Sequence, residues 1–168
     1  MVSGEVAVKT FELQYLAEHD SLTGVYNRHY ITQAINQAIL DFQYHGVRDM
    51  FGILFIDLDR FKLINDSLGH HIGDLVIKAV AFEILASVDH RCQVARWGGD
   101  EFIVLVRNVP HSEALLKVAE QISRKLKAAY NFRDKDIYVG ASIGAVMASL
   151  RYHGADEMLR DGDNARYL

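Results

Sequence analysis

The sequence has few residues that restrict the backbone by a covalent link or a ring. Its 168 residues include one cysteine, Cys92, and one proline, Pro110. A single cysteine excludes an internal disulfide and the class of disulfide-stabilised secreted domains, so we expect a reducing, cytoplasmic compartment. Long apolar runs are absent too, because the longest, Phe51–Ile56, is far below the roughly 20 residues that span a bilayer. The chain is therefore predicted to make no membrane contact of its own, although a longer parent protein is free to be tethered.

An excess of positive charge is also missing, since the formal net charge is −4. This indicates that the chain is not a binder of nucleic acid. A small anionic ligand remains compatible, because a bound metal ion reverses the local field. What is present is ordinary for one globular domain: hydrophobic residues make up 50% and charged residues 24% of the chain, with no repeat and no linker.

Apolar periodicity predicts helices that alternate with strands. The expected helices cover residues 6–18, 27–44, 60–65, 74–88, 112–130 and 156–168, the expected strands cover residues 51–58, 93–97, 100–106 and 136–148, and a loop holds Gly69 and Gly73. Such an order predicts an α+β fold, a sandwich in which helices cover a mixed sheet. Between the second and third strands, Gly98 and Gly99 predict a two-residue hairpin loop, because glycine tolerates the positive φ of primed turns.

Four acidic residues stand at the ends of predicted strands. Asp57 and Asp59 follow the apolar run of the first strand. Because they are two positions apart, they would lie on the same face of that strand. Asp100 and Glu101 follow the glycine pair directly. A single such acid would be explained as a helix cap, but paired acids on neighbouring strands are a plausible oxygen-ligand site for Mg²⁺ or Mn²⁺. That metal would in turn hold nucleotide phosphates.

The pentapeptide Gly98-Gly99-Asp100-Glu101-Phe102 resembles the signature of the GGDEF family of diguanylate cyclases. Four further stretches agree with that family in the same order, and the resemblance covers about residues 18–168. They are Asp20-Ser21-Leu22-Thr23-Gly24-Val25-Tyr26-Asn27-Arg28, Phe55-Ile56-Asp57-Leu58-Asp59-Arg60-Phe61-Lys62, Asn65-Asp66-Ser67-Leu68-Gly69-His70-His71-Ile72-Gly73-Asp74, and Ala141-Ser142-Ile143-Gly144.

The resemblance implies a central, mostly antiparallel sheet flanked by helices, akin to the palm of nucleotide cyclases and polymerases. It implies condensation of two GTP molecules into the bacterial second messenger cyclic di-GMP, with release of two pyrophosphates and two Mg²⁺ or Mn²⁺ ions per active site. The metal ligands would be Asp57, the Leu58 carbonyl, Asp100 and Glu101. Asp100 is favoured as the acceptor of the 3′-hydroxyl proton, with Glu101 as second choice.

The resemblance also assigns the substrate residues. Asn65 and Asp74 match a guanine-recognising pair, and His70 matches a position in the same pocket. Lys62 would stabilise phosphate charge in the transition state, and Gly98 and Gly99 would let the nucleotide approach the backbone. Without the resemblance, Asn65 would be explained as a helix-terminus residue and His70 as an exposed loop histidine. Adjacent histidines lack zinc spacing, so no zinc is assigned.

Catalysis on two GTP molecules implies a homodimer of facing domains. We therefore expect residues 1–18 to form a signalling or linker helix from an upstream sensor, and residues 19–168 to form the GGDEF domain, with its C-terminal end truncated. A downstream EAL domain in the parent protein is left open. The alternatives are an inactive GTP-binding module that regulates a neighbouring domain, a non-catalytic dimerisation domain, and, least favoured, a cyclic di-GMP receptor.

Some residues depart from the family pattern. Its product-inhibition motif, R-x-x-D, is replaced by Asp89 and Cys92 at the matching positions, so feedback inhibition there is not expected. Near the C-terminus, Gly162 stands in place of alanine and Arg166 in place of an apolar residue. We further expect Arg28 to pair with Asp20 across the first turn, and Trp97 to be a packing residue.

Overall fold

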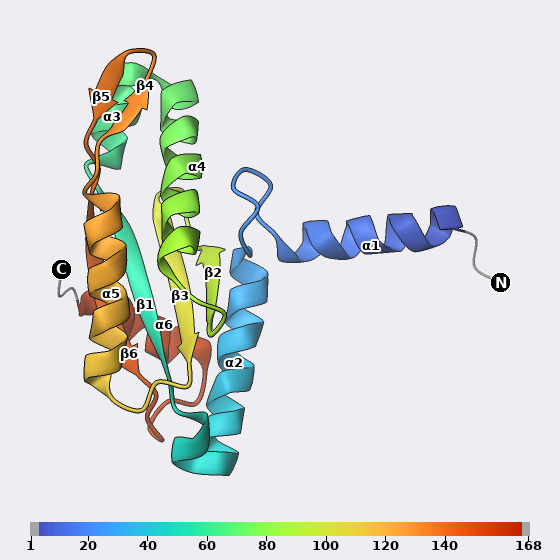
Figure 1. The fold of residues 1–168 in the computed structure, drawn as a ribbon. Helices are drawn as coiled ribbons and strands as arrows, with labels where there is room; N and C mark the ends of the chain where they lie inside the picture. Colours follow the sequence, from blue (N-terminus) through green and yellow to red (C-terminus); the bar gives the residue numbers. More distant parts are fainter. Residues whose placement is uncertain (1–3, 166–168) are drawn as a thin grey trace.

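The computed structural model describes residues 4–165, and its centre is one four-stranded antiparallel sheet (Figure 1). The strand order is β2-β3-β1-β6, where β1 covers Phe51–Asp59, β2 covers Cys92–Arg96, β3 covers Glu101–Arg107 and β6 covers Gly140–Met147. β1 is central and pairs with β3 on one side and β6 on the other. The predicted α+β fold with a mostly antiparallel sheet is confirmed.

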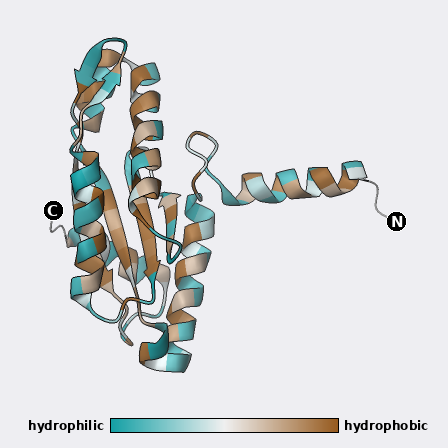
Figure 2. Ribbon diagram, in the orientation of Figure 1, coloured by the Kyte–Doolittle hydropathy of each residue, from teal (hydrophilic) through white to brown (hydrophobic). Residues whose placement is uncertain are grey.

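Helices cover both faces of this sheet. Alternate residues of β1, such as Leu54 and Ile56, pack in one core with α4 (His70–Ser87) and α5 (Ser112–Leu126). The intervening residues, such as Ile53 and Phe55, pack in a second core with α2 (Arg28–His45) and α6 (Ala155–Asn164). This follows from the two-residue period of a strand, which turns successive side chains to opposite faces. Figure 2 shows the resulting apolar colour along the strands.

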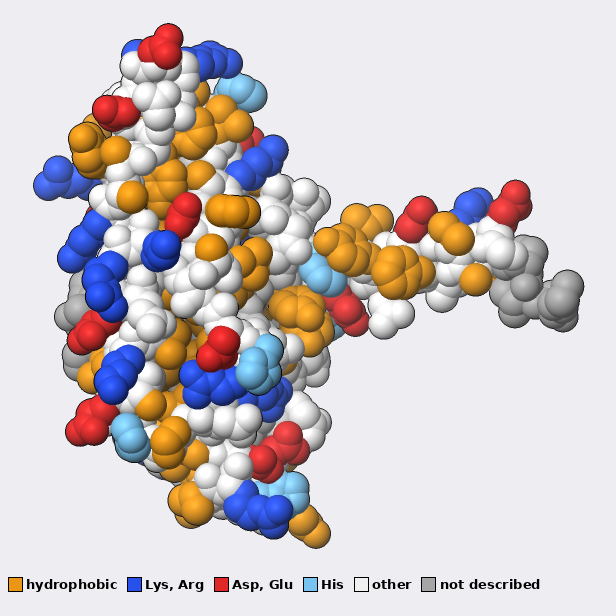
Figure 3. Space-filling view, in the orientation of Figure 1, with side chains coloured by type: hydrophobic (Ala, Val, Ile, Leu, Met, Phe, Trp, Pro, Cys, Tyr) orange, Lys and Arg blue, Asp and Glu red, His pale blue; other side chains and the backbone are white. Residues whose placement is uncertain are grey.

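Smaller elements complete the fold. They are α1 (Gly4–Glu18), the 3₁₀ helix η1 (Gly46–Asp49), α3 (Phe61–Leu68), β4 (Tyr130–Phe132) and β5 (Lys135–Ile137). α1 has no buried residue, and it projects from the domain with its hydrophobic side chains exposed (Figures 1 and 3). Among residues 4–165, no helix is both long and apolar enough to cross a membrane. The division of the chain at residue 18 stays a prediction.

The predicted loop around Gly73 is wrong, because α4 begins at His70 and includes this glycine. A Cβ atom at Gly73 would lie 1.8 Å from the side-chain oxygen of Asn65 in α3. Glycine is required here by the close packing of two helices rather than by a loop. Gly69, with φ of 90°, makes the break between α3 and α4.

The predicted two-residue hairpin loop is also wrong. β2 ends at Arg96 and β3 begins at Glu101, and the backbone N–H of Trp97 donates to the Glu101 carbonyl at 2.7 Å. Neither Gly98 nor Gly99 has a positive φ. Gly98 instead leaves room for a side chain, because a Cβ atom there would lie 2.3 Å from a carboxylate oxygen of Glu101.

The region after α5 differs most from expectation. α5 ends at Leu126, and the single strand expected over residues 136–148 is divided into the end of a β4–β5 hairpin and a separate β6. The hairpin turns at Arg133 and Asp134, whose φ values of 52° and 63° are left-handed. Because neither is a glycine, the sequence carries no strong turn signal there. Of the last predicted helix, residues 166–168 lie outside the described part.

Candidate functional site

The acidic residues meet at one end of the two central strands. Asp57 on β1 is the register partner of Glu101 on β3. The backbone N–H of Leu58 donates to the Asp100 carbonyl at 3.0 Å, which extends the pairing by one residue. The sheet therefore brings together all four residues that were predicted to hold metal.

Electrostatic repulsion is built into this cluster. Burial raises the pKa of Glu101, and the charges of Asp57, Asp100 and Asp163 raise it further, while Arg28 opposes them. Asp163 comes from α6 and was missing from the predicted site. The available signal was the resemblance of Gly162-Asp163-Asn164-Ala165 to a C-terminal family motif, A-D-x-A, in which Gly162 takes the place of the first alanine. The site is thus an acidic cluster to which β1, β3, α6 and the loop between β2 and β3 contribute.

This donor set suits a hard divalent cation. Mg²⁺ and Mn²⁺ prefer carboxylate and carbonyl oxygens, and a cation would relieve the repulsion that raises the pKa of Glu101. Within residues 4–165, no group of three His, Cys, Asp or Glu side chains is arranged so that it could hold a metal ion by itself. A cation at this site would therefore need further ligands, such as the Leu58 carbonyl or oxygens of a substrate.

Asp59 is held apart from this cluster. Its carboxylate accepts a hydrogen bond from the Ser142 hydroxyl at 2.8 Å, on the β6 side of the sheet. Its register partner is Gly140, where a Cβ atom would lie 3.1 Å from the other carboxylate oxygen. Asp59 therefore joins the end of β1 to β6.

The predicted guanine residues lie on α3 and α4. Asn65 is half-buried, and its side chain contacts Gly73, next to Asp74. His70 and Asp74 are exposed and four residues apart at the start of α4, so they share one helix face. Lys62 is exposed in the first turn of α3, three residues before Asn65. The structure thus places Asn65, His70 and Asp74 at the α3–α4 junction, and Lys62 at the start of α3, one turn before Asn65.

The two signature glycines have different surroundings. Apart from its two chain neighbours, no residue has an atom within 4 Å of a Cβ atom built at Gly99, whereas Gly98 is crowded by Glu101. Open space at Gly99 is compatible with a ligand that approaches the backbone.

The expected pair between Arg28 and Asp20 is not formed. Arg28 begins α2, and its guanidinium lies over the Trp97 ring, 4.1 Å from the centroid. Asp20 pairs instead with Arg96 at 3.4 Å. Trp97 packs against the core between α2 and the sheet, as predicted. The two arginines therefore both connect the α1–α2 loop region to the residues around the signature turn.

The two residues at the positions of the missing inhibition motif, Asp89 and Cys92, have other surroundings. Asp89 pairs with Arg91 at 3.1 Å, and the hydrogen bond from Arg91 lowers the pKa of that carboxyl. Burial raises the pKa of the Cys92 thiol to about 11, which disfavours the reactive thiolate form.

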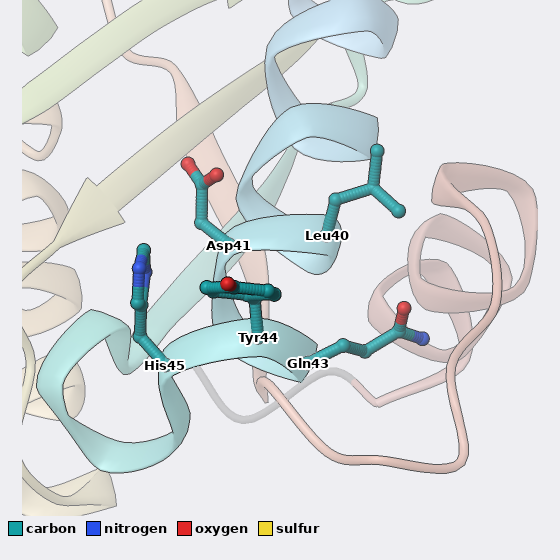
Figure 4. A pocket seen from close by; sticks show the side chains of 5 residues that line it. All are labelled: Leu40, Asp41, Gln43, Tyr44 and His45. Atoms are coloured by element: carbon teal, nitrogen blue, oxygen red, sulfur yellow. The ribbon is translucent and has the colours of Figure 1, made fainter.

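A hollow at the C-terminal end of α2 is separate from the candidate site (Figure 4). It is lined by Leu40, Asp41, Gln43, Tyr44 and His45. α2 leads through η1 into the first residue of β1, whereas the acids stand at the last residues of that strand. The hollow and the acidic cluster therefore lie at opposite ends of β1.

The family profile described as "Diguanylate cyclase, GGDEF domain" matches residues 17–168. The chain belongs to the GGDEF family. This confirms the resemblance drawn from the five sequence motifs. The family assignment covers all of the acidic cluster and the α3–α4 junction.

Similar proteins agree with this family. The chain is 35% identical to the cyclic di-GMP phosphodiesterase PdeR of Escherichia coli over 92% of its own length and 23% of that protein. It is 34% identical to the diguanylate cyclase TpbB of Pseudomonas aeruginosa over 93% of its length and 36% of that protein. A sensory box/GGDEF family protein from Caulobacter crescentus has the same fold, with a TM-score of 0.80 and 30% identity over 88% of this chain and 94% of that one. The chain thus spans about a quarter to a third of these two curated relatives.

Proposed function

We propose that this domain is an active diguanylate cyclase, which condenses two GTP molecules into cyclic di-GMP and two pyrophosphates. The observation that carries the proposal is the meeting of Asp57, Asp100 and Glu101 beside the Leu58 backbone at the ends of β1 and β3. The similarity to TpbB, a diguanylate cyclase, supports it.

Asp57, the Leu58 carbonyl, Asp100 and Glu101 would hold two Mg²⁺ or Mn²⁺ ions. When bound, these cations would neutralise phosphate charge and make the 3′-hydroxyl more acidic. Asp100 accepts the proton of the 3′-hydroxyl of one GTP, whose oxygen attacks the α-phosphorus of the second GTP, and the bond to pyrophosphate breaks. The same step with the two nucleotides in exchanged roles, at the facing site, closes the ring and releases the second pyrophosphate. Glu101, the neighbouring carboxylate, is the alternative acceptor.

Substrate recognition is assigned to the α3–α4 junction. The Asp74 carboxylate accepts hydrogen bonds from the guanine N1–H and 2-amino groups, while Asn65 and His70 contact the same base. Lys62 places its positive charge beside the phosphates, where charge develops as pyrophosphate leaves. Gly98 and Gly99 would let the nucleotide approach the backbone. The open space at Gly99 supports this, whereas the space beside Gly98 is taken by the Glu101 carboxylate.

Each domain would bind one GTP, so the reaction requires a homodimer with facing sites. Bringing two bound nucleotides together replaces an encounter in solution by a positioned reaction, which is a large source of rate. The projecting α1 would belong to a segment that joins the domain to an upstream sensor, in a cytoplasmic part of the parent protein. The division at residues 1–18 and 19–168 is part of this proposal.

A regulatory module without cyclase activity is the second candidate. PdeR, whose name assigns it phosphodiesterase activity, is 35% identical to this chain over a segment that makes up only 23% of PdeR. In this case GTP would bind at the α3–α4 junction and control a neighbouring domain.

Product formation separates the two candidates. The domain at high concentration is incubated with GTP and Mg²⁺ or Mn²⁺, and cyclic di-GMP and pyrophosphate are measured by chromatography. We expect product from the unmodified domain and a loss of at least about 100-fold in Asp100→Ala. Glu120→Gln, an exposed acid on α5, is the matched control and should retain full activity. GTP binding that depends on Asp74, without product, would establish the regulatory module instead.

A further inference from the structure

Arg96 connects two segments that lie far apart in the sequence. Its guanidinium donates to the Gly99 carbonyl from Nε at 3.2 Å and from Nη2 at 2.9 Å. Nη1 lies 3.4 and 3.5 Å from the carboxylate oxygens of Asp20 in the α1–α2 loop. Both side chains are only 20% exposed, so solvent screens this pair less than a surface pair.

The contact with Gly99 bears directly on Asp100. The Gly99 carbonyl belongs to the peptide group that precedes Asp100, and the carbonyl of Asp100 accepts from the Leu58 N–H at 3.0 Å. Both peptide planes around this residue are therefore held, one by Arg96 and the other by β1. Because rotation of these planes redirects the Cα–Cβ bond, the Arg96 contact restrains the direction in which the Asp100 side chain leaves the backbone.

Asp20, the second partner of Arg96, belongs to a loop that several hydrogen bonds hold in place. The Asp20 carboxylate also accepts from the Thr23 N–H at 3.0 Å and from its hydroxyl at 2.7 Å. Tyr26 forms a parallel bridge to β2, with its N–H donating to Val94 and its carbonyl accepting from Arg96. A displacement of this loop would therefore move Asp20 as part of one unit.

The same loop is attached to the end of α1. The side-chain amide of Asn27 donates to the Ala17 carbonyl at 2.9 Å and the backbone N–H of Asn27 donates to the Glu18 carbonyl at 2.8 Å. Four aromatic rings also stack in sequence from α1 to α2, namely Tyr15, His19, Tyr26 and Tyr30. A change in the direction of α1 thus reaches Asp20 through packed rings and hydrogen bonds.

We propose that Arg96 is a positioning residue for the cyclase reaction, which holds the Gly99–Asp100 peptide and transmits the orientation of α1 to it through Asp20. The inference rests on the proposed function. Arginine suits this role because its planar fork donates to two partners in different directions, which the single ammonium group of lysine does not reproduce.

The test compares Arg96→Gln, Arg96→Lys and Asp20→Asn with the unmodified domain. The readouts are kcat, the KM for GTP, the Mn²⁺ concentration that gives half-maximal rate, and the melting temperature. We expect Arg96→Gln to lower kcat by about 10- to 100-fold, as for a metal ligand displaced by about 1 Å, with a higher Mn²⁺ requirement and a nearly unchanged KM for GTP. Arg96→Lys should recover part of the rate.

Asp20→Asn should give a smaller loss in the same direction, because Arg96 keeps its bonds to Gly99. The double variant should be no worse than Arg96→Gln alone, since both changes interrupt one connection. If Arg96→Gln does not fold, Arg96→Lys and Asp20→Asn carry the test. The matched control is Arg91→Gln, which removes an Arg–Asp pair beside the same strand without contact to the turn.

An unchanged Mn²⁺ requirement in the variants, or an equal loss of rate in Arg91→Gln, would overturn the inference. Failure of the proposed function is distinguishable. If the unmodified domain makes no product, Mn²⁺ binding is measured by electron paramagnetic resonance. Weaker Mn²⁺ binding in Arg96→Gln than in Arg91→Gln would then still support the positioning role, and equal binding would refute it.

Discussion

The two ends of β1 have opposite properties, although one strand of nine residues contains both. From Phe51 to Ile56 every residue is buried, and the hydrophobic ones are at most 4% exposed. From Asp57 to Asp59 the strand becomes acidic: Asp57 is half-buried and Asp59 is exposed, while Leu58 between them stays buried. The first part packs against helices on both faces, whereas the second part ends among like charges.

This difference separates stability from chemistry along one strand. The apolar part contributes burial, which is the main favourable term in folding. The acidic part contributes repulsion, which is visible in the raised pKa of Glu101. The acids therefore remain together because the sheet holds their backbones in register, and not because their side chains attract one another.

The largest loss of stability is expected at the apolar end. Ile56 is fully buried beside the acids, and Ile56→Ala should lower the free energy of unfolding by about 2–5 kcal/mol through lost burial and a residual cavity. Urea denaturation followed by circular dichroism measures this change. If Ile56→Ala lowers the free energy of unfolding by less than Ile56→Val does, the strand end must relax to fill the cavity.

The next effect concerns the packing of α6 on β6. A Cβ atom at Gly144 would lie 1.8 Å from the Gly162 carbonyl oxygen and 2.5 Å from that of Ala165. Backbone atoms have little freedom to move away, so Gly144→Ala should cost about 1–3 kcal/mol and loosen the helix that carries Asp163. Denaturation gives the stability, and hydrogen exchange of α6 reports the loosening. Unaltered exchange would contradict this account.

At the acidic end of β1 we expect a smaller effect, in which the substitution stabilises the domain instead of destabilising it. The pKa of Glu101 is raised by burial and neighbouring acids, so the folded state binds its proton more tightly than the unfolded state. Stability from this group is then present below the unfolded pKa and is lost as pH rises through the folded pKa. Glu101→Gln should raise the melting temperature at about pH 8 and change it little at about pH 4. A difference that is constant with pH would refute this explanation.

The smallest change is expected at Gly162, inside α6. A Cβ atom there would meet Phe55 at 3.4 Å, an ordinary van der Waals contact. Gly162→Ala should therefore stabilise the domain by about 0.5–1 kcal/mol, because alanine restricts the unfolded chain and favours a helix. The melting temperatures of Gly162→Ala and Gly144→Ala are compared, since each variant adds one methyl group to the same interface. Destabilisation by Gly162→Ala would show that α6 and β1 are packed more tightly than this contact indicates.

Sequence reasoning succeeded where local pattern determines structure. The apolar run of β1 and the helical spacing of Ile31, Ile35 and Phe42 predicted buried elements that the structure contains. It failed at the β4–β5 turn, where Arg133 and Asp134 adopt a conformation usually taken by glycine. It also failed at Gly73, whose requirement comes from a side chain on another helix.

The candidate site shows the same division. The signature residues and the α3–α4 residues were found because each motif is continuous in the sequence. Asp163 and Arg96 were not, because their importance arises from neighbours more than 60 residues away, Glu101 and Asp20 respectively. Periodicity and propensity do not contain such contacts, which appear only when the sheet is assembled.

The bridge between Tyr26 and β2 has a consequence for self-association. β2 is an edge strand, and such edges offer unpaired backbone groups to other chains, which promotes aggregation. Here the Val94 carbonyl and the Arg96 N–H are already occupied by Tyr26. The loop after α1 therefore shields this edge, and a domain shortened past Tyr26 should precipitate more readily than one that begins at α1.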